Sequence, residues 1–231
     1  MINKEYSYRE LRKDLKRIGV RISHRKYLSH MTFIDCDHIV IKYVIDAIRK
    51  SNDVNFINDC ICSLGVKSFN EAVPFLKEYY DETFGNDNHS STILYICQAL
   101  VRIDDKSIIE WCYSKLNVEI PIYEDVALLE YVVKNEKNED RLTSFLIEMS
   151  IKIVSLSKNY YGNPLEECKY YFSEYALENL AKIDFPRKDT FAKKFEKKLN
   201  DFVRFEKSEW EKKLTISTLK RYRNILKKIL C

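Results

Sequence analysis

The chain has 231 residues, of which 45% are hydrophobic and 32% are charged, a balance that excludes a disordered protein and is typical of a globular one. It contains only four Gly and four Pro residues, too few turn residues for an all-β sandwich or barrel, so we expect long helices joined by short polar turns. The net charge of +4 is unevenly distributed. Basic residues outnumber acidic residues by nine to three in 1–31 and by fifteen to six in 187–231, whereas 32–186 holds twenty-six acidic and fifteen basic residues.

Apolar residues recur at helical spacing through most of the chain. The first such segment begins with Ser7 as an expected cap, and Asp35 or Asp37 is expected to cap the second. We predict an all-α fold of about ten helices, in which the short links make sequential helices pack antiparallel. The helical segments are 7–18, 38–51, 53–64, 70–84, 90–103, 105–116, 123–134, 138–156, 165–183, 187–205 and 208–230.

One joint between two helices recurs along the chain. In "SLGVKSFNEAVPFL", Gly65 is expected to end a helix where a left-handed residue is favourable, Asn70 to cap the next helix, and Pro74 to lie in its first turn. Thirty-six residues later "ALVRIDDKSIIEWC" has the same shape, with Asp104 and Asp105 in the turn. A repeat of this length indicates stacked helix pairs.

This pattern resembles the HEAT-repeat family of α-solenoids, whose consensus is close to leucine-glycine, an acidic turn and alanine-valine-proline-x-leucine. The resemblance is best over residues 53–116 and weak elsewhere, and the turn of the best repeat has Lys67 and Ser68 instead of an aspartate. It implies a right-handed superhelix of helix pairs whose concave face binds other macromolecules, and it implies no reaction.

The expected organisation is a single α-helical solenoid domain over residues 1–231. Within it, residues 1–37 form a basic cap with an irregular segment, residues 38–186 form an acidic core of helix pairs, and residues 187–231 form basic capping helices. The amino-terminal stretch is charged and lacks a secretory apolar region, and no apolar run approaches the roughly 20 residues that span a bilayer. With seven cysteines, an odd number, we expect a reduced, cytoplasmic protein with free thiols.

Candidate metal ligands gather in two places. Cys60 and Cys62 lie two residues apart on a predicted helix, so their side chains point about 200° from each other and cannot share a metal. The segment "SHRKYLSHMTFIDCDH" concentrates His24, His30, Cys36 and His38 together with two aspartates. Its residues either converge on a metal or form a loop whose aspartates cap the next helix, and we predict no metal and no cofactor.

No catalytic motif is found, since the chain has no Gly-rich phosphate loop, no nucleophile elbow and no recognisable Cys-His pairing. We therefore predict that the protein is not an enzyme. Adjacent tyrosines on a helix cannot both face a core, and tyrosine is common in binding surfaces. The candidate partner-binding residues combine such tyrosines with carboxylates: Tyr79, Tyr80, Asp81, Glu82, Asp87, Glu119, Glu124, Asp125, Tyr160 and Tyr161.

The predicted function is non-catalytic protein binding, in which the acidic central region holds a basic protein. One concrete form is a bacterial immunity or antidote protein that masks the nucleic-acid-binding surface of a toxin. The last helix carries an apolar stripe beneath seven basic residues, so it either closes the stack or binds a membrane surface or nucleic acid. The alternative function is a nucleic-acid-binding helical-repeat protein, similar to the helical-repeat DNA glycosylases, that uses the basic ends.

Overall fold

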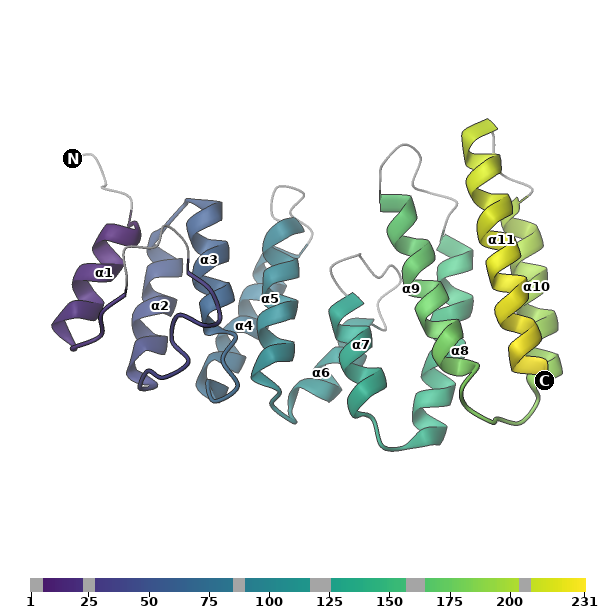
Figure 1. The fold of residues 1–231 in the computed structure, drawn as a ribbon, viewed down its shortest axis with the longest axis horizontal. Helices are drawn as coiled ribbons and strands as arrows, with labels where there is room; N and C mark the ends of the chain where they lie inside the picture. Colours follow the sequence, from purple (N-terminus) through teal and green to yellow (C-terminus); the bar gives the residue numbers. More distant parts are fainter. Residues whose placement is uncertain (1–5, 23–27, 85–89, 117–125, 157–164, 204–208) are drawn as a thin grey trace. The chain divides into compact units, whose positions relative to one another are not determined.

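The computed structural model describes residues 6–22, 28–84, 90–116, 126–156, 165–203 and 209–231 (Figure 1). All regular structure in these residues is helical, which confirms the predicted all-α class, and each predicted segment coincides with one helix. The α-helices are α1 Tyr8–Arg17, α2 Ile39–Lys50, α3 Val54–Leu64, α4 Val73–Thr83, α5 Ser90–Ile103, α6 Ile108–Leu116, α7 Val126–Asn135, α8 Glu139–Leu156, α9 Leu165–Leu180, α10 Lys188–Val203 and α11 Glu209–Leu230, and a 3₁₀ turn, η1 Asn70–Ala72, precedes α4.

The chain forms two compact units, Met1–Trp111 and Cys112–Cys231, and α6 contains the boundary between them. Each unit has its own set of buried apolar side chains. No helix in the described segments is long and apolar enough to cross a membrane. The prediction of one solenoid domain over 1–231 stays a prediction.

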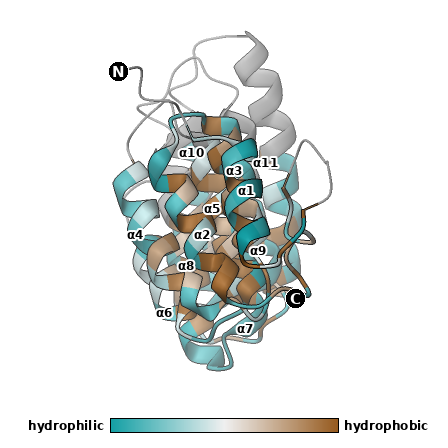
Figure 2. Cartoon of the chain, turned by 90° about the vertical axis from the view of Figure 1, so that its left-hand side faces the viewer, coloured by the Kyte–Doolittle hydropathy of each residue, from teal (hydrophilic) through white to brown (hydrophobic). Residues whose placement is uncertain are grey.

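The first unit is a series of packed helices in which α1 contacts α2, α2 contacts α3, and α5 contacts both α3 and α4. Its interior includes the fully buried side chains of Leu15, Val44, Phe56, Leu76 and Leu100. Figure 2 shows that the outward surface of α1 is hydrophilic, as expected for a helix that buries only Leu11 and Leu15. The core therefore lies between the helices, and each helix keeps one polar face toward solvent.

The two ends of α3 show how local sequence determines a helix. Asp53 caps its first turn, since the carboxylate accepts hydrogen bonds from the backbone N–H groups of Asn55 and Phe56. At the other end, Gly65 has φ −73°, so the predicted left-handed conformation at this residue is wrong. Close packing instead favours glycine here, because a Cβ atom would lie 3.0 Å from the Cα atom of Ala99 on α5.

The start of α4 matches the prediction in one respect and differs in another. Pro74 lies in the first turn of α4. A backbone N–H has no acceptor within the helix at this position, so proline, which lacks the N–H, costs no hydrogen bond. Asn70 does not cap this helix, because η1 comes between them and the residue before α4 is Ala72, which makes no side-chain cap. In the second joint the left-handed conformation falls on Asp104, with φ 59°.

In the second unit α8 packs against α9 and α10, and α11 packs against α9 and α10, while α7 contacts α9. The buried side chains include Leu129 on α7, Leu146 on α8, Leu177 on α9 and Phe195 on α10. The ring of Phe195 meets that of Tyr222 on α11 edge to face, with centroids 5.7 Å apart. The last two helices are therefore joined by an aromatic contact in their common interior.

Candidate protein-binding surface

The outer face of α4 and the 3₁₀ turn that precedes it carry a row of exposed carboxylates, which we call the α4 acidic face: Glu71 in η1, and Glu78, Asp81 and Glu82 in α4. The opposite face of the helix buries Val73, Leu76 and Tyr80. At 100° per residue, Glu78, Asp81 and Glu82 fall within an arc of about 100° on the solvent side. The helix thus directs these three carboxylates away from the core as one group.

Two of these carboxylates lie in the last turn of α4, which contains no basic residue. The helix dipole places partial negative charge at this end, so Asp81 and Glu82 each destabilise the helix by about 0.3–1 kcal/mol. The helix dipole alone would favour lysine or arginine at both positions. Residues that break a local rule of helix stability are often found at functional surfaces.

Aromatic side chains border the α4 acidic face. Tyr79 is half-buried and stacks on Phe75, with ring centroids 5.5 Å apart. Burial raises the pKa of the Tyr79 hydroxyl, and the negative charge of Glu82 raises it further, so this hydroxyl remains a hydrogen-bond donor. Phe84 is 41% exposed and stacks on Tyr80. The face therefore combines charge with accessible apolar area.

Part of the negative charge is balanced by the neighbouring helix and its entry turn. Arg49 of α2 approaches Glu78 at 3.7 Å, with both side chains about 60% exposed. His38 Nδ1 lies 2.8 Å from Glu71 Oε1, and this hydrogen bond lowers the pKa of Glu71. Exposed pairs of this kind contribute little to stability, so a basic partner can compete for both carboxylates.

The predicted partner-binding residues have three outcomes. Tyr79, Asp81 and Glu82 lie on or beside the α4 acidic face. Tyr80 was wrongly included, because its side chain is 2% exposed and meets the Trp111 ring edge to face. The remaining predicted residues lie outside the described segments: Asp87, Glu119, Glu124, Asp125, Tyr160 and Tyr161.

The predicted residues did not include Glu71, Glu78 or Phe84, which belong to or border this surface. The available signal was the spacing of Glu78 and Glu82, which are four residues apart and so share a helix face. Phe84 gave no signal, since a phenylalanine four residues after Tyr80 is expected in the core.

The candidate metal ligands do not form a site in the part of the chain that the structure describes, where no three His, Cys, Asp or Glu side chains are placed to hold an ion. His38 pairs with Glu71, and Asp37 Oδ1 accepts a hydrogen bond from the N–H of Ile39 at the start of α2. The predicted cap by Asp35 or Asp37 is wrong, because the residue that precedes α2 is His38 and it makes no side-chain cap. His24 lies outside the described residues. Cys60 is fully buried, while Cys62 is half-exposed and accepts a hydrogen bond from Arg102.

Comparison with known proteins finds no matching family model, no matching curated protein and no matching solved structure.

Proposed function

We propose that this chain is a non-catalytic protein-binding module that holds a basic partner through the α4 acidic face. The observation that carries the proposal is the placement of Asp81 and Glu82 in the last turn of α4, where both carboxylates oppose the helix dipole. A basic partner would reverse this penalty, because its cations would neutralise the carboxylates and the helix end together. A bacterial immunity or antidote protein that masks the nucleic-acid-binding surface of a toxin is the concrete form of this proposal.

The surroundings of the face fit such a role. Opposite charge accelerates encounter, whereas tight binding also needs apolar contact area at the centre of the interface. Tyr79 and Phe84 supply this area at the edge of the carboxylate row. Tyrosine and phenylalanine are enriched in protein interfaces, so the composition of the face suits a protein better than a small ion.

The resemblance to HEAT repeats is part of the same proposal. Support comes from two consecutive pairs of helices along the chain, α3 with α4 and α5 with α6. The repeat pattern aligns Ala72 and Val73, at the start of α4, with Ile108 and Ile109, at the start of α6. Helical repeats bind macromolecules through extended faces, and the α4 acidic face belongs to the second helix of one such pair.

The proposal is tested with a variant that neutralises three carboxylates of α4, Glu78→Gln/Asp81→Asn/Glu82→Gln. The matched control neutralises three carboxylates elsewhere, Glu130→Gln/Glu148→Gln/Glu178→Gln. The control changes the net charge equally at three exposed glutamates on α7, α8 and α9. Both variants and the native chain are used as bait in lysate of the native host, with quantitative mass spectrometry of the captured proteins at increasing salt. We expect one basic protein to be captured by the native chain and the control, and lost with the α4 variant and at high salt.

A photo-crosslinking residue at position 82 identifies contacts directly, with position 148 as its control. Crosslinking of the same basic protein from position 82 alone supports the proposal. Equal capture by the native chain and the α4 variant, or capture that does not depend on salt, contradicts it.

A further inference from the structure

The two helices at the end of the second unit expose a dense group of cations, which we call the C-terminal basic surface. Its members are all exposed and lie on or next to α10 and α11: Arg187, Lys193, Lys194, Lys197, Lys198, Lys220, Arg221, Arg223, Lys227 and Lys228. The exposed acidic residues among the described side chains of these two helices are Asp189 and Glu196. The chain has no acidic residue after Glu211, so the imbalance does not depend on which residues are described.

On α10 the two signs of charge are separated around the helix. At 100° per residue, Lys193, Lys194, Lys197 and Lys198 occupy an arc of about 140°, and Asp189 and Glu196 lie together on the adjoining flank. The lysines form two rows with a spacing of four residues. Like charges at this spacing destabilise a helix by a few tenths of a kcal/mol per pair, so folding does not explain the arrangement.

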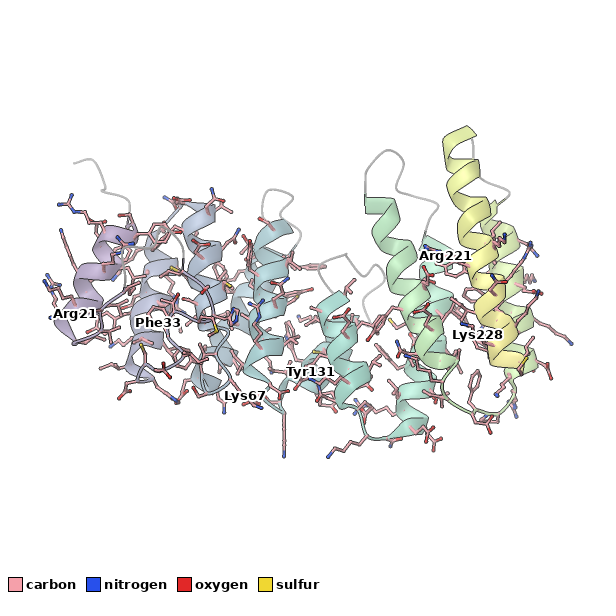
Figure 3. All side chains as sticks on the ribbon, viewed as in Figure 1. Arg21, Phe33, Lys67, Tyr131, Arg221 and Lys228 are labelled. Carbon is pink, nitrogen blue, oxygen red and sulfur yellow. The ribbon has the colours of Figure 1, made fainter. Side chains whose placement is uncertain are left out.

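Few of these cations are neutralised by their own chain. Arg221 is directed toward α9, where its Nη2 atom lies 3.0 Å from Glu174 Oε2 (Figure 3). In the described residues we find no ion pair for the four α10 lysines or for Lys220, Arg223, Lys227 and Lys228 on α11. Among the described residues, the surface therefore offers eight positive charges to an external anion.

The packing of the described half of α11 disfavours insertion of this helix into a membrane. An amphipathic helix binds a bilayer by burying its apolar face among the lipids. In α11 the apolar stripe is already buried in the protein, with Tyr222, Leu226 and Ile229 each 3% exposed or less. Among the described side chains of α11, which begin at Leu219, the accessible surface is mainly cationic and Leu230 is the exposed large apolar residue, so the attraction that this surface provides is mainly electrostatic.

From the density and type of these charges we infer that the C-terminal basic surface binds the phosphate backbone of a nucleic acid. The four α10 lysines, from Lys193 to Lys198, are spread along about 8 Å of the helix axis, a linear charge density close to the one phosphate charge per roughly 1.7 Å of duplex. An acidic protein would require a different composition, since lysine is depleted in protein interfaces and aromatic residues are enriched there. No aromatic side chain is exposed on the described parts of α10 and α11.

The same composition predicts binding that is independent of base sequence. Seven of the ten cations are lysines, which contact phosphates as point charges, whereas base recognition commonly uses the bidentate hydrogen bonds of Arg, Asn or Gln. Duplex DNA, single-stranded DNA and RNA all present this phosphate chemistry. The surface also lies on a different unit from the α4 acidic face, so either proposal can fail without the other.

The test measures binding of the full chain to fluorescein-labelled duplex DNA, single-stranded DNA and RNA by anisotropy over a range of salt concentrations. The variant Lys194→Gln/Lys198→Gln/Lys227→Gln/Lys228→Gln removes four cations from the surface. The matched control, Arg9→Gln/Lys13→Gln/Lys16→Gln/Lys42→Gln, removes four exposed cations from the first unit. Circular dichroism and thermal unfolding establish that both variants are folded.

We expect the native chain to bind with an affinity that falls steeply with salt, the variant to lose at least tenfold in affinity at low salt, and the control to lose less than threefold. For duplex DNA the slope of log K against log salt should become shallower by about 3–4 in the variant, which is about 0.9 per lost phosphate contact. The preferred nucleic acid among the three probes identifies the natural class.

Three results would overturn the inference. The first is absence of salt-dependent binding to all three probes, and the second is an equal loss of affinity in variant and control. The third is equal binding, per negative charge, to vesicles of phosphatidylserine and phosphatidylcholine or to polyglutamate, which would indicate a membrane surface or an acidic protein as the partner.

Discussion

The backbone of Gly65 lies directly against Ala99 of α5, so that a Cβ atom at residue 65 would stand 3.0 Å from Ala99 Cα and 3.3 Å from the carbonyl oxygen of Cys62. Both neighbouring atoms belong to the backbone, so neither can move without displacing a helix. The contact joins α3 to α5 across 34 residues of sequence. It favours glycine at a position where the negative φ would also be accessible to other residues.

We predict that Gly65→Ala destabilises the protein by about 1–3 kcal/mol, because the added methyl group must push α3 and α5 apart. The sign of the effect is decisive. Without the close contact, alanine at this φ would stabilise the fold by about 0.4–1 kcal/mol, because it restricts the unfolded chain. Urea unfolding followed by circular dichroism measures the difference, and a stabilised Gly65→Ala variant would show that the two helices are not in contact here.

Asp53 is the cap of α3, and its Oδ1 atom accepts hydrogen bonds from the N–H groups of Asn55 at 3.0 Å and Phe56 at 3.2 Å. We expect Asp53→Ala to lower the free energy of unfolding by about 1 kcal/mol, and Asp53→Asn to retain most of it. Ser7→Ala is the comparison, because Ser7 precedes α1 but makes no hydrogen bond to its backbone N–H groups. If the two alanine variants lose equal stability, Asp53 does not act as a cap.

These two positions show which features the sequence could predict. The helical segments and the early Pro74 depend on residues within one or two turns of each other, so periodicity was sufficient to predict them. Capping rules were not sufficient, because the predicted caps at Ser7 and Asn70 are not formed and the cap at Asp53 was not predicted. The role of Gly65 depends on Ala99, a residue on another helix, and local rules assigned it the wrong conformation. The same limit applies to the α4 acidic face. The excess of acidic residues is visible in the sequence, but only the structure shows that exposed carboxylates lie together on α4.

Tyr79 and Tyr80 illustrate this limit at adjacent positions. Tyr80 is buried between Trp111 and Phe84, so we predict that Tyr80→Ala lowers the free energy of unfolding by about 3–5 kcal/mol. Tyr79 is half-buried, and Tyr79→Ala should lower it by about 1 kcal/mol. Thermal unfolding of both variants measures the difference. Equal destabilisation would contradict the assignment of Tyr80 to the core and Tyr79 to the surface boundary.

Glu136 makes the stability of the second unit depend on pH. Its Oε2 atom accepts a hydrogen bond from the Tyr113 hydroxyl at 2.9 Å and lies 3.5 Å from Arg141 Nη1, while the guanidinium of Arg141 covers the Tyr113 ring. Burial acts to raise the pKa of Glu136, but hydrogen bonds from the Asn138 N–H and Tyr113, together with the charge of Arg141, outweigh it and lower the pKa below its usual value.

A carboxyl group with a lowered pKa in the fold contributes stability that is present above its pKa in the unfolded chain, about 4.3, and is lost as the pH falls through the folded value. We therefore expect Glu136→Gln to cost about 1–2 kcal/mol at neutral pH and to show a smaller loss of stability on acidification than the native chain. Glu130→Gln, an exposed glutamate of α7, should change neither quantity. Parallel pH profiles for the native chain and Glu136→Gln would disprove the role of this group.

The cysteines should react in an order set by burial. Cys60, Cys97 and Cys112 are fully buried, and burial followed by the charge of Asp59 raises the pKa of the Cys60 thiol. Cys231 is exposed at the end of α11. Because the thiolate is the nucleophile, we predict that N-ethylmaleimide modifies Cys231 first under native conditions and leaves the three buried thiols unmodified until the protein unfolds. Peptide-level mass spectrometry over a time course measures each site, with a sample in urea as the control in which all sites react. Rapid native modification of Cys60 would mean that α3 is not packed against α2 and α5.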